Sequence, residues 1–231
     1  MSKVIALVLC AALLLPGGAF SAAPPNAAER QRIEQALRDY AAQQQAEQEK
    51  NQDRLIAGNS AALLDDPHTP VIGNAGADVA IVEFTDYTCP YCKAAEPRLE
   101  KLLKDDPRVK LVVKEYPILT PVISLLAAKA ALASMKQGKY ARFHQTMMLF
   151  RGQLTADAVY DMAKDSGLDV NRLRKDMESP EVADEIIATF NVARAIRAFQ
   201  TPTFIVNNHL LAGASADIDF PKVVAAARAK R

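Results

Sequence analysis

The sequence predicts an α/β fold in which a parallel strand–helix–strand unit is followed by a long helical stretch and a return to β-structure. The first observation is a mostly apolar, β-branched run over 79–84 (V-A-I-V-E-F), which is typical of a buried strand. Helical spacing of apolar residues over 90–103 and a second strand-like run over 109–116 are the other two observations. Because a strand, a helix and a strand in this order form a right-handed crossover, we expect the two strands to be parallel.

Helix signals then fill the middle of the chain. Thr155 is a suitable N-cap, Gly167 is suited to the position after a helix end, and Pro180 is suited to a first helical position. The helices predicted from these signals and from apolar spacing span 121–136, 139–150, 156–166, 169–177 and 180–199.

Strand signals return near the C-terminus. The runs at 203–206 and 209–212 flank an Asn-Asn pair, which predicts two strands joined by a tight hairpin. A last helix is expected to begin at Asp217 or Asp219 and to continue through Arg231.

The first 23 residues have the order of a secretory signal peptide. One positive charge, Lys3, precedes an apolar run of twelve residues from Val4 to Leu15, and small residues follow it. The run is too short to span a bilayer as a helix, although an uncleaved anchor is the alternative. We therefore expect export to the periplasm, with cleavage after Ser21 or Ala23.

The composition limits the classes of function. Half of the 231 residues are hydrophobic, which supports a sizeable core. The 28 Lys and Arg residues against 27 Asp and Glu give a net charge of +1, whereas nucleic-acid-binding proteins usually carry a basic excess. Without residues 1–23 the chain keeps two cysteines, Cys89 and Cys92, in a compartment where disulfides persist.

These two cysteines form a C-P-Y-C motif. The loop between them is too short for a disulfide to stabilise the fold much by chain entropy, which favours a catalytic pair over a structural one. If strand 79–84 feeds helix 90–103, Cys89 lies at the helix N-terminus, where backbone N–H groups and the helix dipole stabilise a thiolate. The sequence therefore predicts thiol–disulfide exchange, with Cys89 as nucleophile and the more buried Cys92 as resolving thiol.

A closed structural zinc site is disfavoured. There is no second cysteine pair, and the three histidines, His68, His144 and His209, are scattered along the chain. We therefore expect no resident metal and no cofactor.

The stretch F-T-D-Y-T-C-P-Y-C-K-A-A-E-P resembles the active-site segment of thioredoxin-fold proteins of the DsbA family. Glu83 stands six residues before Cys89, where that family carries a buried glutamate that handles protons. Pro97 stands eight residues after Cys89 and matches the proline that kinks the active-site helix. Thr201-Pro202 precedes a strand, as does the cis-proline loop of the family.

The resemblance covers roughly 71–231 and implies a thioredoxin fold with an inserted helical subdomain at about 121–199. It implies catalytic roles for Cys89, Cys92 and Glu83, and substrate contacts for Pro90, Tyr91, Thr201 and Pro202. A cis peptide bond before the last of these would let the Thr201 backbone pair with an extended substrate.

Three positions around this motif leave questions open. Tyr91 stands where the oxidase DsbA has histidine, which favours a weaker oxidant. Gln200 stands where many relatives have glycine, which leaves the loop shape open. Lys93 could assist the thiolate, although a solvated side chain is the simpler expectation.

Residues 27–57 predict a helical arm. Apolar or aromatic residues such as Ile33, Leu37 and Tyr40 follow a 4-then-3 spacing with a polar middle, which indicates a weak coiled-coil seam. A solvated helix lying on its own domain is the alternative. The arm and the phrases E-Y-P-I-L and H-Q-T-M-M resemble the ScsC-like branch, which includes trimeric disulfide isomerases assembled through an N-terminal helix. By that resemblance, residues 24–70 are an oligomerisation arm and linker.

We therefore expect a periplasmic thiol-disulfide oxidoreductase that acts on exported proteins, with isomerase activity favoured over DsbA-type dithiol oxidase activity. The expected partners are exported protein substrates, a membrane redox partner that resets the thiols, and further copies of this chain, with a trimer favoured. A copper-binding protein of metal tolerance is a further alternative, because two thiolates suit Cu(I) and ScsC-like proteins are linked to copper tolerance. The Met147-Met148 pair is more typical of a helix core than of a copper site.

Overall fold

The computed structural model describes residues 26–74, 76–212 and 218–229. The expected signal peptide at 1–23, its two cleavage positions, and Asp217 lie outside these residues. The chain divides into two compact units, Met1–Glu47 and Gln48–Arg231. Within the described ranges, no helix has both the length and the apolar character needed to cross a membrane.

The predicted arm is a continuous helix, α1 (Ala27–Gly58), which crosses the boundary between the two units. Its start is stabilised by a reciprocal cap, since Glu29 N donates to Asn26 Oδ1 at 2.9 Å and Asn26 N donates to a Glu29 carboxylate oxygen at 2.8 Å. In the described part of the first unit, the apolar seam side chains are all exposed: Ile33, Leu37 and Tyr40.

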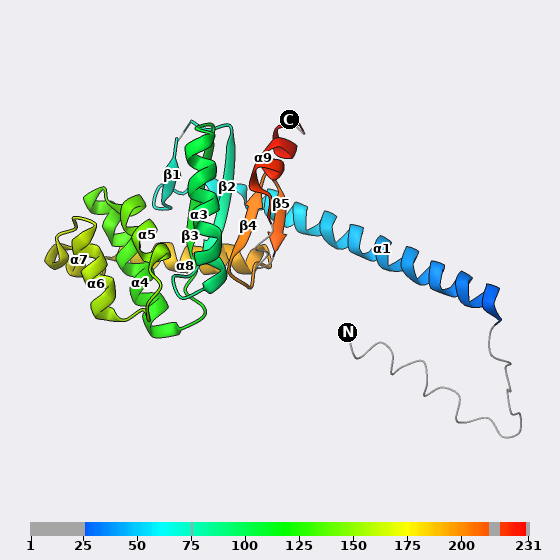
Figure 1. Cartoon of the computed structure of the whole chain (residues 1–231), viewed down its shortest axis with the longest axis horizontal. Helices are drawn as coiled ribbons and strands as arrows, with labels where there is room; N and C mark the ends of the chain where they lie inside the picture. The colour runs from blue at the N-terminus through cyan, green and yellow to red at the C-terminus, as the bar shows by residue number, and fades with distance from the viewer. Residues whose placement is uncertain (1–25, 75, 213–217, 230–231) are drawn as a thin grey trace, which may run out of the picture. The chain divides into compact units, whose positions relative to one another are not determined.

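The second unit contains a five-stranded sheet with the order β1-β3-β2-β4-β5 (Figure 1). The strands are β1 (Val71–Gly73), β2 (Val79–Thr85), β3 (Val109–Glu115), β4 (Thr203–Val206) and β5 (His209–Ala212). As predicted, β2 and β3 are parallel, with α3 (Pro90–Asp105) as their crossover, and β4 and β5 form an antiparallel hairpin. This is a thioredoxin fold with a helical insertion and a preceding N-terminal helix.

The strand β1 was not predicted. It has only three residues, and it is defined by antiparallel pairing with β3, where Val71 lies opposite Val112. A three-residue segment is too short to show an alternation of apolar and polar residues, so its strand character is seen only in its pairing with β3.

The remaining helices follow the predicted order, with two exceptions. They are α2 (Ser60–Leu64), α4 (Pro121–Ser134), the short 3-10 helix η1 (Met135–Gln137), α5 (Tyr140–Leu149), α6 (Ala156–Asp165), α7 (Val170–Asp176), α8 (Pro180–Ala195) and α9 (Phe220–Ala229). The helix α2 was not predicted, and η1 replaces the end of the helix predicted over 121–136. The predicted cap of α6 is confirmed, because Thr155 Oγ1 accepts from Ala158 N at 3.2 Å. The prediction for α8 was too long: the helix ends at Ala195 rather than near Phe199, because Arg197 adopts a left-handed conformation with φ 56°.

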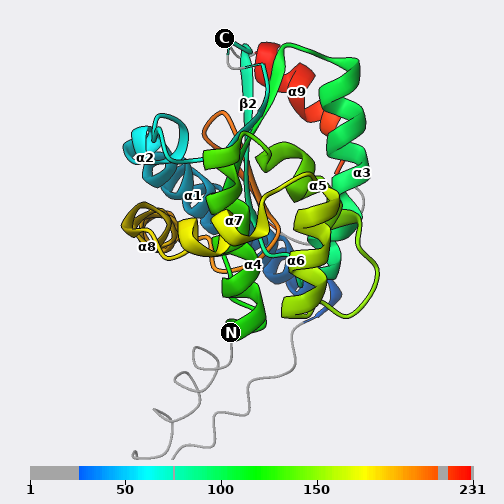
Figure 2. The same ribbon diagram turned by 90° about the vertical axis from the view of Figure 1, so that its left-hand side faces the viewer.

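Helices cover both faces of the sheet. Figure 2 shows α3 on one side of β2 and α2 with α8 on the other, and α9 packs on the α3 side. Alternation along β2 sends Ile81 and Glu83 toward α3, and Val82 and Phe84 toward the opposite core, which includes Ile56 from the end of α1. Glu83 is therefore a carboxylate aimed into the core beneath the active-site helix.

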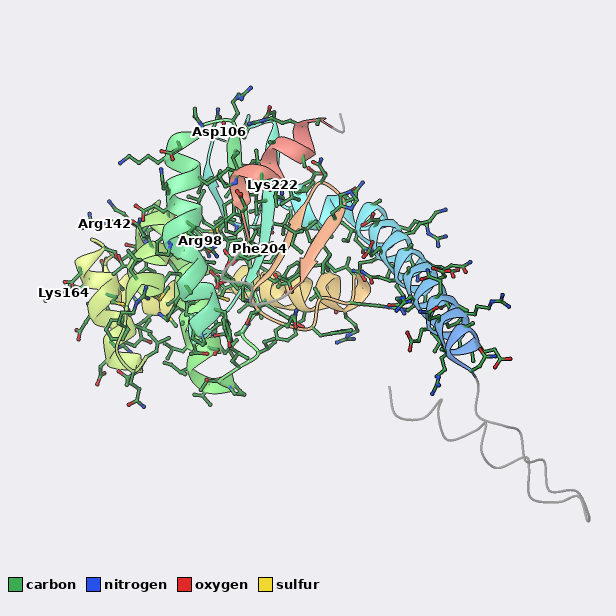
Figure 3. All side chains as sticks on the ribbon, turned by 45° about the vertical axis from the view of Figure 1, so that its right-hand side comes forward. Arg98, Asp106, Arg142, Lys164, Phe204 and Lys222 are labelled. Atoms are coloured by element: carbon green, nitrogen blue, oxygen red, sulfur yellow. The ribbon has the colours of Figure 1, made fainter. Side chains whose placement is uncertain are left out.

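Aromatic packing joins α9 to the sheet. The rings of Phe204 and Phe220 meet edge-to-face, with centroids 5.1 Å apart, and the guanidinium of Arg98 lies 5.6 Å from the Phe220 ring. Figure 3 shows Arg98 on α3 and Phe204 on β4. These contacts hold α3 against the C-terminal helix α9, and α9 against β4 of the sheet.

Candidate functional site

Cys89 is the N-cap residue of α3. Its backbone is extended (φ −77°, ψ 116°), and its sulfur accepts a hydrogen bond from the backbone N of Cys92 at 3.4 Å. Pro90 follows at the first helical position, where a backbone N–H would have no helical partner. The predicted strand-to-helix junction is confirmed, with the sulfur at the end of a helix that favours negative charge.

The surroundings of Cys89 favour its thiolate. A hydrogen bond with the Cys92 side chain, and a smaller one with the Cys92 backbone, lower the pKa of Cys89 to about 6 against the opposing effect of burial. At neutral pH this sulfur is therefore mostly ionised, whereas an ordinary thiol is mostly protonated. A thiolate is the form that attacks a disulfide.

Cys92 has the opposite properties. Its side chain is completely buried, and burial, followed by the hydrogen bond with Cys89 and the charge of Glu83, raises the pKa of Cys92. Burial also raises the pKa of Glu83 well above its usual range, and the neighbouring carboxyl of Glu96 raises it further. A buried carboxylate whose pKa is raised binds a proton more readily than an exposed one, so it can accept the proton of a neighbouring thiol.

The segment at Thr201 and Pro202 closes over the nucleophile. The Cys89 thiol donates to the backbone oxygen of Thr201 at 3.3 Å, and the Thr201–Pro202 peptide bond is cis, as expected. The structure thus brings together five of the seven predicted site residues around the sulfur pair: Glu83, Cys89, Cys92, Thr201 and Pro202. Tyr91 is 54% exposed and Pro90 is also exposed, so both lie at the surface of the site.

Lys93 is not the solvated side chain that the sequence suggested. Its Nζ donates to the backbone oxygens of Met147 at 2.6 Å and Phe150 at 3.0 Å, at the C-terminal end of α5, where carbonyls lack helical partners. Burial lowers the pKa of Lys93 to about 8, and the charge of Arg151 acts in the same direction. Met147 and Met148 are both fully buried, as a helix core requires.

Asp86 organises the loop that carries the nucleophile, and sequence reasoning missed it. Its buried carboxylate accepts from Thr88 N at 2.8 Å and from Ser124 Oγ at 2.9 Å, and from Ile118 N and Leu119 N at 2.9 and 3.0 Å. The spacing of Asp86 and Thr88 fits an Asx-turn, and this signal in the sequence could have identified Asp86. The carboxylate ties the loop before α3 to the start of α4.

A buried polar cluster lies next to the sulfur pair and was also missed. It consists of Tyr87 before α3, Glu96 on α3, Glu115 on β3, and Tyr140 and His144 on α5. These five side chains are spread along the sequence, and only the packing of α3, β3 and α5 brings them together. Glu96 is the acidic residue of C-K-A-A-E, but nothing in the sequence indicated that its side chain faces His144.

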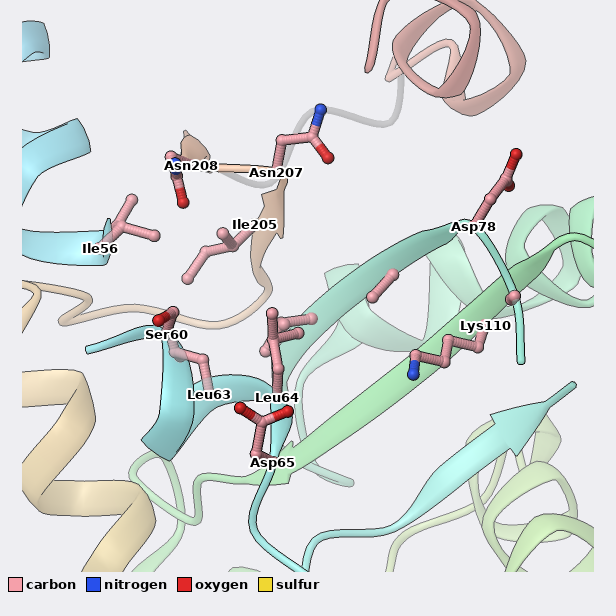
Figure 4. Close-up of a pocket in the computed structure, with 13 residues that line it drawn as sticks. Ile56, Ser60, Leu63, Leu64, Asp65, Asp78, Lys110, Ile205, Asn207 and Asn208 are labelled. Atoms are coloured by element: carbon pink, nitrogen blue, oxygen red, sulfur yellow. The ribbon is translucent and has the colours of Figure 1, made fainter. Parts of the chain in front are cut away.

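A cavity of about 620 Å³ opens beside the nucleophile. Its lining includes Pro90 and Lys93 from α3, Ile123 from α4, and Phe150 and Leu154 from the segment after α5. A second cavity, of about 210 Å³, lies between the end of α1, α2 and the sheet and contains Lys110 and Asp65 (Figure 4). Neither cavity is lined by a cysteine, but the first is lined by Thr88 and Pro90, the residues on either side of Cys89.

Metal-binding groups are limited around these residues. In the part of the chain that the structure describes, no group of three or more His, Cys, Asp or Glu side chains is arranged to hold a metal ion. His144 is buried in the polar cluster, while His68 and His209 are exposed elsewhere.

The chain is similar in sequence and in fold to known proteins. A family model described as thioredoxin matches residues 65–226. The structure of a thioredoxin-like oxidoreductase from Silicibacter pomeroyi DSS-3 is 40% identical, covers 73% of this chain and 97% of that one, and has a TM-score of 0.69. A linker-deletion mutant of ScsC from Proteus mirabilis is 26% identical, covers 91% of this chain and 100% of that one, and has a TM-score of 0.72.

Curated relatives differ in length. A probable disulfide bond formation protein D from Bacillus cereus is 27% identical over 164 residues, which cover 65% of this chain and 74% of the relative. The Na(+)/H(+) antiporter NhaA 3 from Salinispora tropica is 32% identical over 162 residues, or 67% of this chain. The chain spans only about a quarter of that relative's length, since the match covers 25% of it.

Proposed function

Because the chain belongs to the thioredoxin family, we propose that it is a periplasmic thiol-disulfide oxidoreductase that exchanges disulfides with exported proteins and acts foremost as an isomerase. The observation that carries this proposal is the pairing of Cys89, whose pKa is lowered to about 6, with the buried, protonated Cys92. One thiol is ready to attack, and the other is held back until a proton acceptor is available.

The exchange begins when the Cys89 thiolate attacks a client disulfide. A bond forms between the Cys89 sulfur and one client sulfur, the client disulfide breaks, and the second client sulfur leaves as a thiolate. In an isomerase, that client thiolate attacks another disulfide of the client and frees a different client thiolate. A client thiolate then attacks the client sulfur of the mixed disulfide, forms a new client disulfide and releases Cys89 as a thiolate. If the client stalls, Cys92 gives its proton to the Glu83 carboxylate, bonds to the Cys89 sulfur and releases the client thiolate, so that the client is reduced and the cysteine pair oxidised.

The surface around the sulfur suits unfolded or misfolded chains. Large apolar side chains are exposed on the segments around the active-site loop: Tyr91 close to the nucleophile in the sequence, Leu119 and Val122 at the start of α4, and Phe199 before the Thr201 loop. Thr120 and Ser124 hydrogen-bond with Thr88, which places this part of α4 beside the active-site loop. An extended apolar segment could lie there while its cysteine reacts.

Self-association is the second part of the proposal. An isomerase holds one client through several exchanges, and several sites on one assembly raise the local concentration of reactive thiolates. The support is the exposed seam of Ile33, Leu37 and Tyr40 on α1, which repeats at coiled-coil spacing. We propose a homo-oligomer, with a trimer favoured, and a membrane protein that resets the cysteine pair.

The test is reactivation of ribonuclease with scrambled disulfides by the chain lacking residues 1–23, beside oxidation of the fully reduced ribonuclease. An isomerase, kept reduced, restores activity to the scrambled substrate, and Cys89→Ser abolishes that restoration. Oxidation without reactivation would instead assign a dithiol oxidase. Retained exchange in Cys89→Ser would refute the thiol mechanism altogether.

A further inference from the structure

The cavity of about 620 Å³ beside the nucleophile combines an apolar wall with positive charge. Ile123 on α4, with Phe150 and Leu154 after α5, forms the apolar part of its lining, which also includes Thr88 and Pro90 from either side of the nucleophile. Cavities that bind ligands are commonly of this size and mostly apolar, with a few polar groups that fix the orientation of the ligand. The cavity is therefore large enough for side chains of a client that is bonded to the nucleophile.

The aromatic part of this wall depends on a glycine. A Cβ atom on Gly152 would lie 2.5 Å from Cζ of the Phe150 ring, well inside the optimal separation of about 3.5–4.0 Å between carbon atoms. The ring therefore lies directly against the backbone of Gly152, and a larger residue at this position would displace it from the cavity wall.

Two cations supply the charge of the cavity. Among the described residues that line it, the charged side chains are those of Lys93 and Arg151. Lys93 Nζ donates to the backbone oxygens of Met147 and Phe150, and Arg151 Nη1 donates to that of Met148 at 2.9 Å. These carbonyls at the C-terminal end of α5 lack helical partners and carry partial negative charge, so they hold both cations in place.

Both cations keep donors for a ligand. Lys93 directs two of its three N–H donors at backbone oxygens, and the contact with Met148 occupies Nη1 of a guanidinium that has five N–H donors. Arg151 is exposed, so a ligand can reach it. Burial and then the charge of Arg151 lower the pKa of Lys93 to about 8, so the two cations repel each other. A carboxylate placed beside both would offset this repulsion.

The acidic side chain of the active-site loop is bonded within that loop. The buried carboxylate of Asp86 accepts from Thr88 N, from Ser124 Oγ and from the backbone N–H groups of residues 118 and 119. These donors satisfy Asp86 on the loop side of the cavity. The charge that the cavity presents to a ligand is therefore positive.

We propose that this cavity receives the client residues next to the cysteine that is bonded to Cys89, and that Arg151 and Lys93 favour clients with an acidic side chain there. Arg151 offers the carboxylate a planar set of N–H donors, and Lys93 adds a second positive charge. An apolar neighbour in the client packs on Ile123 and Phe150. The inference rests on the proposed exchange at Cys89 and names the class of client that the site selects.

The first test measures the stability of a mixed disulfide. Short peptides contain one leucine, one cysteine, and Glu, Gln or Lys directly before or after the cysteine, and each is first joined to 2-mercaptoethanol. In the Cys92→Ala variant, which lacks the resolving thiol, the Cys89 thiolate bonds to the peptide sulfur, and 2-mercaptoethanol leaves as a thiolate that takes a proton from water. At low salt, the exchange constant for the Glu peptide should exceed that for the Gln peptide by about three- to five-fold, with the Lys peptide lowest.

Further substitutions in the Cys92→Ala protein show where this preference arises. Arg151→Gln should reduce it to roughly two-fold or less, and Arg151→Glu should reverse the order of the Glu and Lys peptides. Arg142→Gln is the matched control and should keep the full preference. Arg142 is also an exposed arginine that donates to a backbone oxygen, that of Asp165 at 2.9 Å, but it lines a different cavity.

The second test locates the peptide without altering either cation. Amide NMR signals of the Cys92→Ala protein are recorded before and after the mixed disulfide forms. The signals of Gly152 and Leu154 should shift, and they should shift differently with the Glu and Gln peptides. Leu64 and Asp65 line the other cavity, so their signals should stay the same. Unchanged signals at Gly152 and Leu154 would show that the proposed site is wrong.

The outcomes separate this inference from the proposed function. Equal exchange constants for the Glu and Gln peptides, or a higher constant for the Lys peptide, overturn the acidic preference while exchange at Cys89 stands. An equal preference for Glu in Arg151→Gln and Arg142→Gln overturns the role of the cavity. If Cys89 forms a mixed disulfide with none of the peptides, the proposed function itself fails. If Arg151→Gln does not fold, the NMR comparison in the Cys92→Ala protein decides the site.

Discussion

The sulfur of Cys89 lies 3.3 Å from the backbone oxygen of Thr201, although 112 positions separate the two residues in the sequence. The thiol is the donor, so this contact exists only while Cys89 is protonated. Cys89 is 1% exposed and Thr201 is 9% exposed, so the segment that would pair with an extended client also covers the nucleophile. Ionisation of Cys89 removes this donor, whereas the side chains of Cys92 and, more weakly, Thr201 favour the thiolate and lower the pKa of Cys89, so Thr201 acts on both forms of the thiol.

Removal of the Cys92 thiol should make Cys89 a weaker acid. The hydrogen bond with the Cys92 side chain is the largest cause of the lowered pKa of Cys89, about 6, so Cys92→Ala should raise that pKa by roughly one unit. Cys92→Ser keeps an O–H donor and is the matched control, with a smaller rise expected. Thiolate absorbance followed against pH measures both. An equal rise in the two variants would show that the hydrogen bond is not the cause.

Glu83→Gln should slow the resolving step and leave the attacking step intact. The neutral amide cannot accept the Cys92 proton, so closure of the disulfide should slow by about 100-fold, while Cys89 alkylation keeps its rate. Stopped-flow measurement of mixed-disulfide resolution beside iodoacetamide alkylation separates these steps. Equal slowing of both would instead indicate general damage to the site.

The same substitution should also stabilise the protein at alkaline pH. Burial raises the pKa of Glu83 in the folded state, so the stability that its protonated form provides is complete below the unfolded-state pKa and is lost as pH rises through the folded-state pKa. Glu83→Gln has no such loss. Urea unfolding at acidic and alkaline pH should show an advantage of the variant that grows with pH, and a constant difference would contradict this reasoning.

Asp86→Ala should loosen the active-site loop. The variant leaves the partly buried backbone N–H groups of Ile118 and Leu119 and the buried Ser124 hydroxyl without their acceptor, which should cost about 3 kcal/mol of unfolding free energy. Asp161→Ala, at an exposed position on α6, is the control and should cost little. Urea denaturation gives both values, and a small loss for Asp86→Ala would mean that water replaces the carboxylate.

The buried ion pair on the opposite face should behave as a unit. Lys114 Nζ lies 3.5 Å from Glu185 Oε1, and both side chains are nearly inaccessible. Lys114→Met should cost about 3–5 kcal/mol because it leaves an unpaired buried carboxylate, whereas adding Glu185→Leu should recover most of the loss. A double-mutant cycle in urea measures the coupling, and additive losses would rule it out.

Charges placed on the seam of α1 should dissociate the proposed oligomer. Ile33→Glu with Leu37→Glu puts two like charges where the apolar side chains would meet in neighbouring copies, so the assembly should become monomeric. Gln31→Glu with Gln35→Glu adds the same charge at the same spacing on the helix face away from the seam. Light scattering after size-exclusion chromatography gives the mass of each. Loss of ribonuclease reactivation only in the seam variant would tie isomerisation to assembly.

Local signals were sufficient for most of the fold. The apolar runs of β2 and β3 and the caps at Thr155 and Pro180 each act within a few residues, so the sequence predicted these elements closely. The early end of α8 was not predictable, because the left-handed residue there is Arg197 rather than a glycine or asparagine. The strand β1 depends on β3, about forty positions away.

The candidate site likewise has one part that local sequence signals predict and another that depends on how distant elements pack. Cys89 and Cys92 lie within four consecutive residues, C-P-Y-C, a motif with a chemical meaning of its own. His144 and Tyr87 are separated by 57 positions, and Glu115 and Tyr87 by 28, so their contacts follow only from how α5 and β3 pack against the loop before α3. The partners of buried polar groups are seen only in the folded structure, where hydrogen bonds to these partners offset the free-energy cost of burial.

The order of the strands has a consequence for the newly made chain. The central strand β2 pairs on one side with β3, which follows it closely, and on the other with β4, which begins at Thr203. At typical rates of synthesis, β4 emerges roughly 6–24 s after β2. During that interval the ribosome-bound chain carries two thiols beside a sheet that still lacks β4 and β5. A product that terminates before β4 keeps both cysteines but lacks the strand that holds the Thr201 segment over them. Premature termination therefore yields chains whose thiols are not covered by this segment.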